Sequence, residues 1–218
     1  MKISKDIQLQ NIWPIPLRRD GLLAKSDIWG NHCRFQQGQH HLVLAPSGRG
    51  KSTLIHLLYG LRQDYEGQFS LLGEEASTRS AEQWLEWRRT ELAIVFQDLR
   101  LFPQLTAWEN IEIKSQLGSP LKKEQIIEMC HSLEIDMLFH QKAGELSLGQ
   151  QQRVALVRAL VQPFSFLLLD EPFSHLDATN IERAIHLILA ACKREQAGMI
   201  LVSLGEDYGL SFDQHLTL

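Results

Sequence analysis

The chain has 218 residues, of which 44% are hydrophobic and 22% are charged. A chain of this length forms one large domain, or one domain with a small inserted subdomain, and folding buries roughly 70% of its unfolded surface. The composition excludes disorder, collagen and coiled coil as descriptions of the whole chain. With a net charge of −4, the chain lacks the broad basic surface of a nucleic-acid-binding protein, so we expect no nucleic-acid partner.

Apolar runs and cysteines indicate the compartment. The longest apolar runs, such as 166–169 and 199–202, are far shorter than the roughly 20 residues that cross a bilayer. The N-terminus has no long apolar run either, which predicts that it is not a signal peptide. Cys33, Cys130 and Cys192 lie far apart and match no metal or redox spacing, so they are expected to be reduced thiols of a cytosolic protein.

The first half of the chain alternates strand patterns with helix patterns. Residues 7–12 alternate apolar and polar side chains, as a half-buried strand does. Further strands are predicted at 28–35, 41–44, 68–72 and 92–96, and helices at 51–61 and 81–89. The portion up to about residue 44 is expected to be antiparallel.

The middle of the chain, residues 98–148, has no strong strand pattern. It carries segments with helical spacing, most clearly 121–133, and is predicted to be a helical subdomain inserted into a core formed by 1–97 and 149–218. The remaining predicted elements are helices at 150–161 and 178–193 and strands at 166–169, 199–202 and 215–218. Strands that alternate with helices predict an α/β fold with a mostly parallel sheet.

A glycine-rich loop connects the predicted strand 41–44 to the helix that begins at Lys51. In a phosphate-binding loop, glycines let backbone N–H groups converge on phosphate oxygens, and the helix N-terminus adds its dipole. Lys51 is expected to reach the β- and γ-phosphates of a nucleotide, Ser52 to bind Mg²⁺, and Thr53 to hold the α-phosphate side. Ala45 replaces the first glycine of the pattern, and a chance glycine-rich loop is the alternative. The predicted phosphate-binding residues are Pro46, Ser47, Gly48, Arg49, Gly50, Lys51, Ser52 and Thr53.

Two acidic residues follow the apolar run 166–169. Ligands of parallel sheets bind at the carboxyl ends of the strands, so Asp170 is expected beside the phosphate loop, where it holds Mg²⁺ through water. Glu171 is expected to extend toward the γ-phosphate and polarise an attacking water. The alternative is that both acids cap the next helix.

The sequence Leu-Ser-Leu-Gly-Gln at 146–150 resembles the signature L-S-G-G-Q of ATP-binding cassettes. With it, the chain from about residue 7 to residue 218 is similar to the nucleotide-binding subunits of ABC transporters. The resemblance implies a single nucleotide-binding domain over 1–218. Its fold would be the ABC ATPase core with a mostly parallel sheet, an antiparallel N-terminal portion and the helical subdomain. It also implies ATP and Mg²⁺ as ligands and ATP hydrolysis as the reaction.

The same resemblance implies further site residues and partners. Gln97 would contact Mg²⁺ and the attacking water, which makes it both a catalytic and a metal-binding candidate. Two subunits pack head to tail in this family, as a homodimer or a heterodimer, and each closes over ATP held by the other. An integral membrane permease is the other implied partner, which places the chain on the cytoplasmic face of the cell membrane. The residues expected to reach the partner's ATP are Ser147, Gly149, Gln150 and Asp177. For Ser147, an ordinary helix N-cap is an equal alternative.

Several positions depart from the family pattern. Leu148 replaces the first signature glycine, and Leu204 occupies the position of the switch histidine. An aromatic residue that stacks on adenine is expected near 13–17, where Trp13 is available for stacking or for core packing. The segment 97–111 is similar to the lipoprotein-release, macrolide-export and cell-division branch.

The departures leave two functions open. The first is an ATP-hydrolysing subunit that drives a separate membrane permease. The second, which Leu148 and Leu204 favour, is a degenerate nucleotide-binding switch with negligible hydrolysis that regulates a membrane partner. A soluble ABC protein of translation or DNA repair and a phosphate-loop kinase are less compatible with a single cassette that carries the signature.

Overall fold

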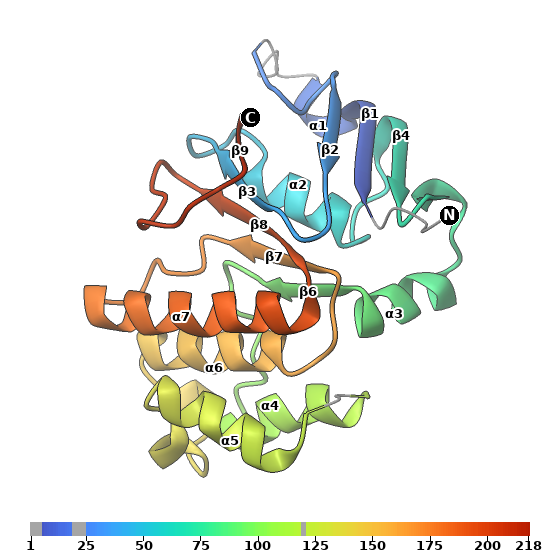
Figure 1. The fold of residues 1–218 in the computed structure, drawn as a ribbon. Helices are drawn as coiled ribbons and strands as arrows, with labels where there is room; N and C mark the ends of the chain where they lie inside the picture. Colours follow the sequence, from blue (N-terminus) through green and yellow to red (C-terminus); the bar gives the residue numbers. More distant parts are fainter. Residues whose placement is uncertain (1–5, 19–24, 119–120) are drawn as a thin grey trace.

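Two β-sheets and the helices packed on them make up the molecule (Figure 1), which confirms the predicted α/β fold. The computed structural model describes all residues except 1–5, 19–24 and 119–120. We predict that the N-terminal segment is not a signal peptide, and its first five residues lie outside the described part. No helix in the described part combines the length and the apolar character that a membrane crossing needs.

The larger sheet has five strands in the order β6-β7-β8-β3-β9, and all neighbours are parallel. Every residue of its first three strands is buried, as is typical of a parallel sheet covered on both faces. The strands are β6 (Leu92–Val95), β7 (Phe166–Asp170), β8 (Gly198–Ser203), β3 (His40–Leu44) and β9 (Gln214–Thr217). The carboxyl ends of β3, β7 and β8 therefore meet at one edge.

The smaller sheet is antiparallel and has the strand order β2-β1-β4-β5. Its strands are β1 (Ile7–Pro14), β2 (His32–Phe35), β4 (Tyr65–Leu71) and β5 (Glu74–Glu75). The expectation of antiparallel pairing up to residue 44 is wrong for β3, which pairs parallel with β8 and β9. The reason is burial: three consecutive residues of β3, from His41 to Val43, are buried, and only a strand inside the parallel sheet covers both of its faces.

Helices cover the two faces of the parallel sheet. Leu167 and Leu169 of β7 join the buried cluster that contains α6 and α7, whereas Phe166 and Leu168 join the cluster that contains α2. The helices are α1 (Ile15–Arg18), α2 (Lys51–Leu58), α3 (Ala81–Thr90), α4 (Ala107–Gln116), α5 (Lys123–Ser132), α6 (Leu148–Leu160) and α7 (Ala178–Glu195). Short 3₁₀ turns are η1 (Ala76–Thr78), η2 (Asp136–Leu138) and η3 (Ala143–Glu145).

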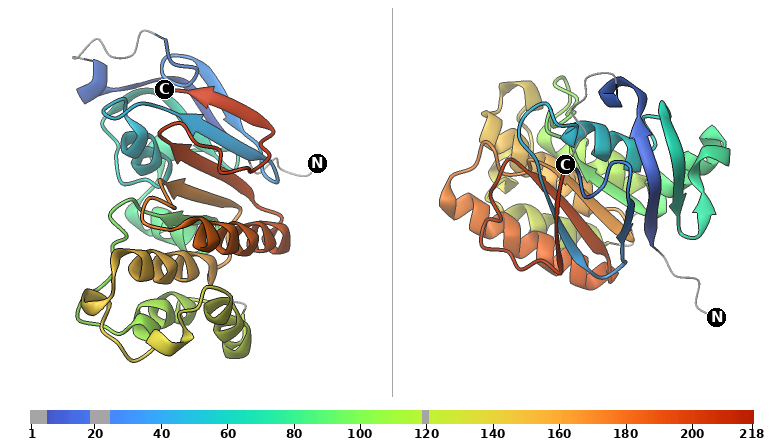
Figure 2. Two further views of the ribbon diagram at one scale, coloured as in Figure 1. Left: turned by 90° about the vertical axis from the view of Figure 1, so that its left-hand side faces the viewer. Right: turned by 90° about the horizontal axis from the view of Figure 1, so that it is seen from above.

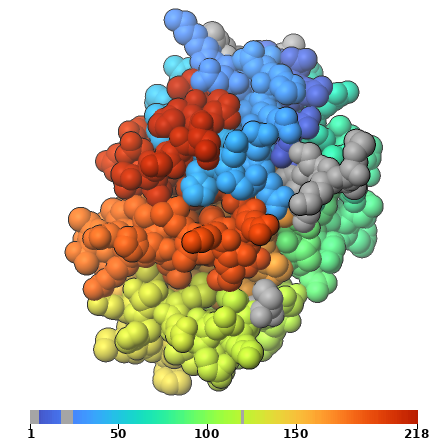
Figure 3. All heavy atoms as spheres, viewed as in Figure 1, coloured from blue at the N-terminus to red at the C-terminus, as the bar shows by residue number. Residues whose placement is uncertain are grey.

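The segment 98–148 contains α4 and α5, which lie beyond α6 on the side away from the antiparallel sheet (Figures 1 and 2). The described part of this segment contains no β-strand, as predicted. The space-filling view shows the atoms of this segment packed directly against those of α7 (Figure 3). Buried Ile111 and Ile126 belong to the same cluster as Val154 of α6 and Leu167 of β7. The division of the chain into a core and a helical subdomain remains a prediction.

Candidate functional site

The loop between β3 and α2 turns sharply at two glycines. Gly48 has a φ of 78° and Gly50 a φ of 94°, a left-handed conformation in which a β-carbon is strained. A β-carbon at Gly50 would also lie 2.5 Å from Cδ1 of Leu17, so α1 approaches the loop at this point. A β-carbon at Gly48 would meet nothing within 4 Å, so the loop is open on that side. Ala45, at the position of the missing glycine, is buried, and its N–H donates to Ser203 at 3.1 Å.

Lys51, the first residue of α2, turns its side chain back toward this loop. Its Nζ donates to the carbonyl oxygens of Ala45, at 3.2 Å, and Pro46, at 3.3 Å. The same Nζ lies 3.4 Å from Oε1 of Glu171, and the two side chains are only 8% and 12% exposed. The structure therefore brings together the predicted lysine and one predicted acid from segments 120 residues apart along the chain.

Asp170 ends β7 and is 1% exposed. Burial raises the pKa of its carboxyl group, and a hydrogen bond with the Ser52 side chain opposes this effect. Its Oδ1 atom has no hydrogen-bond partner in the described part of the chain. A buried carboxylate oxygen without a partner, next to a hydroxyl oxygen, matches the hard oxygen ligands that Mg²⁺ prefers. The residues predicted for magnesium thus fit the ion chemically.

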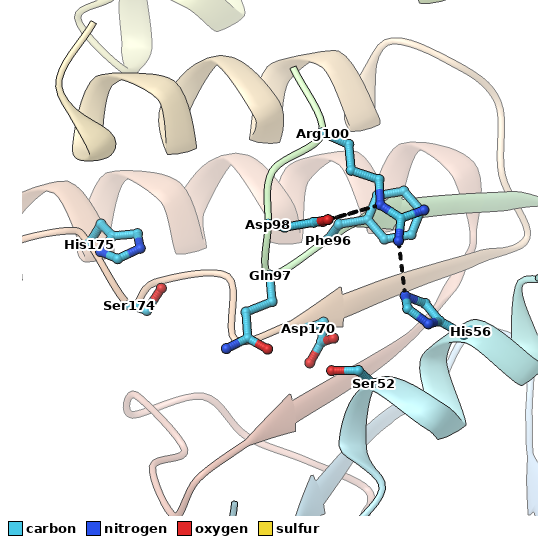
Figure 4. Close-up of a pocket in the computed structure, with 9 residues that line it drawn as sticks. All are labelled: Ser52, His56, Phe96, Gln97, Asp98, Arg100, Asp170, Ser174 and His175. Atoms are coloured by element: carbon cyan, nitrogen blue, oxygen red, sulfur yellow. Dashed lines mark hydrogen bonds and ion pairs between the residues drawn. The ribbon is translucent and has the colours of Figure 1, made fainter. Parts of the chain in front are cut away.

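A cleft of about 490 Å³ opens beside these residues (Figure 4). The Gln97 side chain, on the loop after β6, points into it from the side opposite Ser52. The lining residues are Ser52, His56, Phe96, Gln97, Asp98, Arg100, Asp170, Ser174 and His175. The predicted residues Ser52, Gln97 and Asp170 therefore share one cleft.

Sequence patterns did not indicate one group at this cleft. The Arg100 guanidinium lies 3.9 Å above the ring of Phe96, is 3.2 Å from the Asp98 carboxylate and contacts Nε2 of His56 at 3.3 Å. Burial lowers the pKa of His56, and the charge of Arg100 lowers it further. Only the tertiary fold brings α2 and the loop after β6 together, so no local spacing marks this group.

The signature residues lie at the start of α6 and engage one another. The Ser147 hydroxyl accepts a hydrogen bond from the Gln150 N–H at 3.3 Å, and the Gln150 side chain accepts one from the Ser147 N–H at 2.9 Å. This reciprocal capping box stabilises the helix start. Leu148 is 55% exposed beside it. At Gly149, a β-carbon would lie 2.8 Å from the carbonyl oxygen of His175, so only glycine fits there.

Asp177 caps α7 in a similar way. Its Oδ1 accepts a hydrogen bond from the Asn180 N–H at 2.9 Å, and this bond is the main reason that the pKa of Asp177 is lowered. Neither Asp177 nor Ser147 is among the residues that line the cleft with Ser52. Within one chain, the structure therefore does not bring the predicted partner-facing residues to the cleft that Ser52 lines.

A second cleft, of about 620 Å³, is lined by Glu171. Leu204 lines it and is 58% exposed, and Tyr208 lines it as well, with its ring 4.8 Å from that of Phe173. Trp13, the candidate for adenine stacking, lies elsewhere and packs against Gly30, where a β-carbon would overlap the indole ring. This position favours the core-packing alternative for Trp13.

A strand–loop–helix whose lysine meets the acidic end of another parallel strand of the same sheet defines a phosphate-loop nucleotide-binding protein. The family described as ABC transporter matches residues 30–174 of the chain. The chain therefore belongs to the ABC transporter family, as an ATP-binding member.

The named relatives of the chain are of several kinds. The chain is 36% identical to an uncharacterized ABC transporter ATP-binding protein of Thermotoga maritima, over 85% of this chain and 80% of the relative. It is 33% identical to the macrolide export ATP-binding/permease protein MacB of Bdellovibrio bacteriovorus, over 83% of this chain but 28% of that protein. It is 34% identical to the thiamine import ATP-binding protein ThiQ of Escherichia coli O157:H7, over 77% and 71% of the two lengths. Because exporters and importers both occur, the branch remains a prediction.

The fold is also similar to that of solved structures. The dimeric structure of MJ0796, a bacterial ABC transporter cassette, superposes with a TM-score of 0.80 over 97% of this chain and 94% of that one, at 23% sequence identity. This similarity confirms the predicted cassette fold.

Proposed function

We propose that this chain binds ATP with Mg²⁺, hydrolyses it and thereby drives a separate membrane permease. The observation that carries the proposal is the meeting of Lys51 with Glu171 at 3.4 Å beside buried Asp170. A buried cation next to two carboxylates, at the open end of a phosphate loop, is suited to a ligand that brings both phosphate charge and a metal ion.

The roles of the residues follow from their positions. Lys51 would exchange its contact with Glu171 for the β- and γ-phosphate oxygens. Ser52, Asp170 and Gln97 would hold Mg²⁺, which neutralises phosphate charge when it is bound. Backbone N–H groups of residues 46–53 would bind the remaining phosphate oxygens.

Glu171, released from Lys51, would then act on water. A water oxygen attacks the γ-phosphorus in line, the bond from that phosphorus to the bridging oxygen breaks, and ADP and inorganic phosphate result. The Glu171 carboxylate orients this water and accepts a proton from it as the attack proceeds, and the proton then passes to the inorganic phosphate or to solvent. Positioning and charge stabilisation carry most of the catalysis in such reactions.

A second cassette would complete the site. Ser147, Gly149 and Gln150 at the start of α6, together with Asp177, would face the ATP of the partner subunit, because a helix N-terminus attracts phosphate charge. The dimeric MJ0796 cassette and the ATP-binding/permease name of MacB support a dimer that works with a permease. Such a dimer would lie on the cytoplasmic face of the membrane.

The second candidate function is a nucleotide switch without turnover, favoured by Leu148 and Leu204. Phosphate release by the purified chain, measured with ATP in Mg²⁺ and again in excess EDTA, separates the two. Turnover that requires Mg²⁺ supports the ATPase. Saturable binding of Mg-ATP without phosphate release supports the switch, and the absence of both contradicts the proposal.

A further inference from the structure

Gln152 is a buried polar residue to which the proposed function gives no role. It lies on α6, five residues after the Ser147 N-cap, and is 1% exposed. A buried amide group is costly unless both its oxygen and its nitrogen find partners. Its partners therefore show what it holds in place.

Both partners belong to the turn that follows β7. The Oε1 atom of Gln152 accepts a hydrogen bond from the N–H of His175 at 2.9 Å. Its Nε2 donates to the carbonyl oxygen of Glu171 at 3.4 Å. An amide oxygen must face an N–H and an amide nitrogen must face a carbonyl, so these contacts fix the orientation of the side chain. Gln152 thus spans the two ends of one five-residue turn.

The turn that Gln152 spans has an unusual backbone. Glu171 has a φ of 48°, in the left-handed region that non-glycine residues seldom adopt. Such a conformation persists only when surrounding contacts hold it. One is the bond from the Glu171 N–H to Val202 of β8, at 3.0 Å, and another is the Gln152 amide.

The start of α6 is fixed against the same turn by a second contact. Gly149 approaches the His175 carbonyl oxygen so closely that a β-carbon there would be 2.8 Å away. The signature end of α6, the Gln152 side chain and the turn at 171–175 therefore form one mechanically connected unit.

We infer that Gln152 is a positioning residue that sets the place of the Glu171 carboxylate through the main chain and couples it to the signature end of α6. The inference rests on the proposed function, because it matters for turnover only if Glu171 acts on the attacking water. Both hydrogen bonds of the Gln152 amide go to the turn at 171–175 and neither goes to the phosphate loop, so Gln152 affects turnover rather than nucleotide affinity.

The test is steady-state and single-turnover hydrolysis of Mg-ATP by Gln152→Met, which keeps the length of the side chain and removes both bonds. We expect kcat to fall about 10- to 100-fold, since a small displacement of a catalytic group has effects of this order. KM should stay within about threefold of the wild-type value, because the substitution removes no contact that binds ATP in the ground state. Gln152→Asn, which keeps the amide group but is too short to span the turn, should give a comparable loss and serves if the Met variant does not fold.

Gln162→Met is the matched control. Gln162 is 3% exposed, and its amide donates to the carbonyl oxygens of Arg88 and Leu92, away from Glu171. This variant should lower the melting temperature and leave the kcat of the folded protein unchanged. A loss of kcat in Gln162→Met equal to that in Gln152→Met would overturn the inference.

A double-mutant cycle decides between positioning and general destabilisation. In the Glu171→Gln background, Gln152→Met should cause no further loss of the residual single-turnover rate, because the group that it positions is already disabled. An equal loss in both backgrounds, or wild-type kcat in Gln152→Met, overturns the inference alone. A wild-type chain that does not turn over Mg-ATP overturns the proposed function and the inference together.

Discussion

Lys51 and Glu171 form an ion pair, and each side chain is nearly buried. We predict that Lys51→Ala weakens ATP binding by about 10- to 100-fold, since hydrogen bonds to charged groups contribute about 1.5–3 kcal/mol each. Titration with a fluorescent ATP analogue measures the effect. Arg49→Ala is the control, because Arg49 is exposed in the same loop, and its affinity should change less than about threefold. Wild-type affinity in the lysine variant would contradict the assignment.

The Asp170 carboxylate lowers the stability of the folded chain, although the proposed function needs it to bind Mg²⁺. Its folded-state pKa is raised by burial, so the ionised carboxylate destabilises the folded chain at any pH above that pKa. We predict that Asp170→Asn raises the melting temperature of the nucleotide-free chain at pH 7 and removes the stabilisation that Mg-ATP gives.

Differential scanning calorimetry across pH checks the sign of this effect. The advantage of the Asn variant should be largest at neutral pH and shrink as pH falls through the raised pKa, because wild-type Asp170 then becomes neutral too. A variant that is less stable than wild type at pH 7 without nucleotide would mean that the carboxylate is compensated in the apo chain.

At the scale of elements, Asp177 is first of all the N-cap of α7, an 18-residue helix. We predict that Asp177→Ala lowers the melting temperature by a few degrees, while Asp177→Asn, whose side chain also caps, restores most of it. ATP binding by the isolated chain should be the same in both variants, because Asp177 does not line the cleft. Weaker binding in both would indicate that Asp177 contacts nucleotide within one chain.

The loss in Asp177→Ala should also depend on pH. The native pKa of Asp177 is lowered by its bond from the Asn180 N–H, so the contribution is present above the ordinary carboxyl pKa and is lost as pH falls through the lowered value. Thermal denaturation at neutral and acidic pH measures this, and a loss that stays constant down to the acid range would contradict the capping charge.

Elements with strong local patterns could be predicted from the sequence. The buried run at 166–169 and the loop before Lys51 gave β7, the phosphate loop and the meeting of their residues, because the carboxyl ends of parallel strands share one edge. The orientation of β3 could not be predicted in the same way, since pairing partners far along the chain determine it. Gln152 and the contact between His56 and Arg100 were missed for the same reason, because their partners lie 19 to 44 residues away.

At the scale of the whole molecule, closure of two cassettes should require ATP that is bound and not hydrolysed. We predict that Glu171→Gln elutes as a dimer with ATP and Mg²⁺ and as a monomer without nucleotide, because the amide keeps the shape of Glu171 and removes its charge. Turnover should fall about 10²–10⁴-fold, as expected when a general base is lost. Size-exclusion chromatography with light scattering measures the dimer.

The double variant Glu171→Gln/Lys51→Ala is the control for this dimer. It keeps the amide at position 171 but lacks the cation for the phosphates, so it should remain monomeric at the same ATP concentration. A dimer that forms equally in both variants would be independent of the bound phosphates and would contradict ATP-driven closure.

Leu148 and Leu204 bear on the rate of the closed dimer, because both are more than half exposed and the second lies in the cleft beside Glu171. Leucine offers no hydrogen bond to a γ-phosphate, and one transition-state donor contributes about 3–4 kcal/mol, or ~10²–10³-fold in rate. We therefore predict that wild type is a slow ATPase and that Leu204→His raises kcat by up to this factor, with Leu148→Gly adding a further increase by easing closure.

Leu85→His, at an equally exposed leucine on α3, is the matched control and should leave kcat unchanged. The measurement is steady-state phosphate release by all four proteins, with the permease present where it can be purified. If wild type already turns over as fast as Leu204→His, another group near Glu171 supplies the missing donor, and the hydroxyl group of Tyr208 in the same cleft is the first to remove.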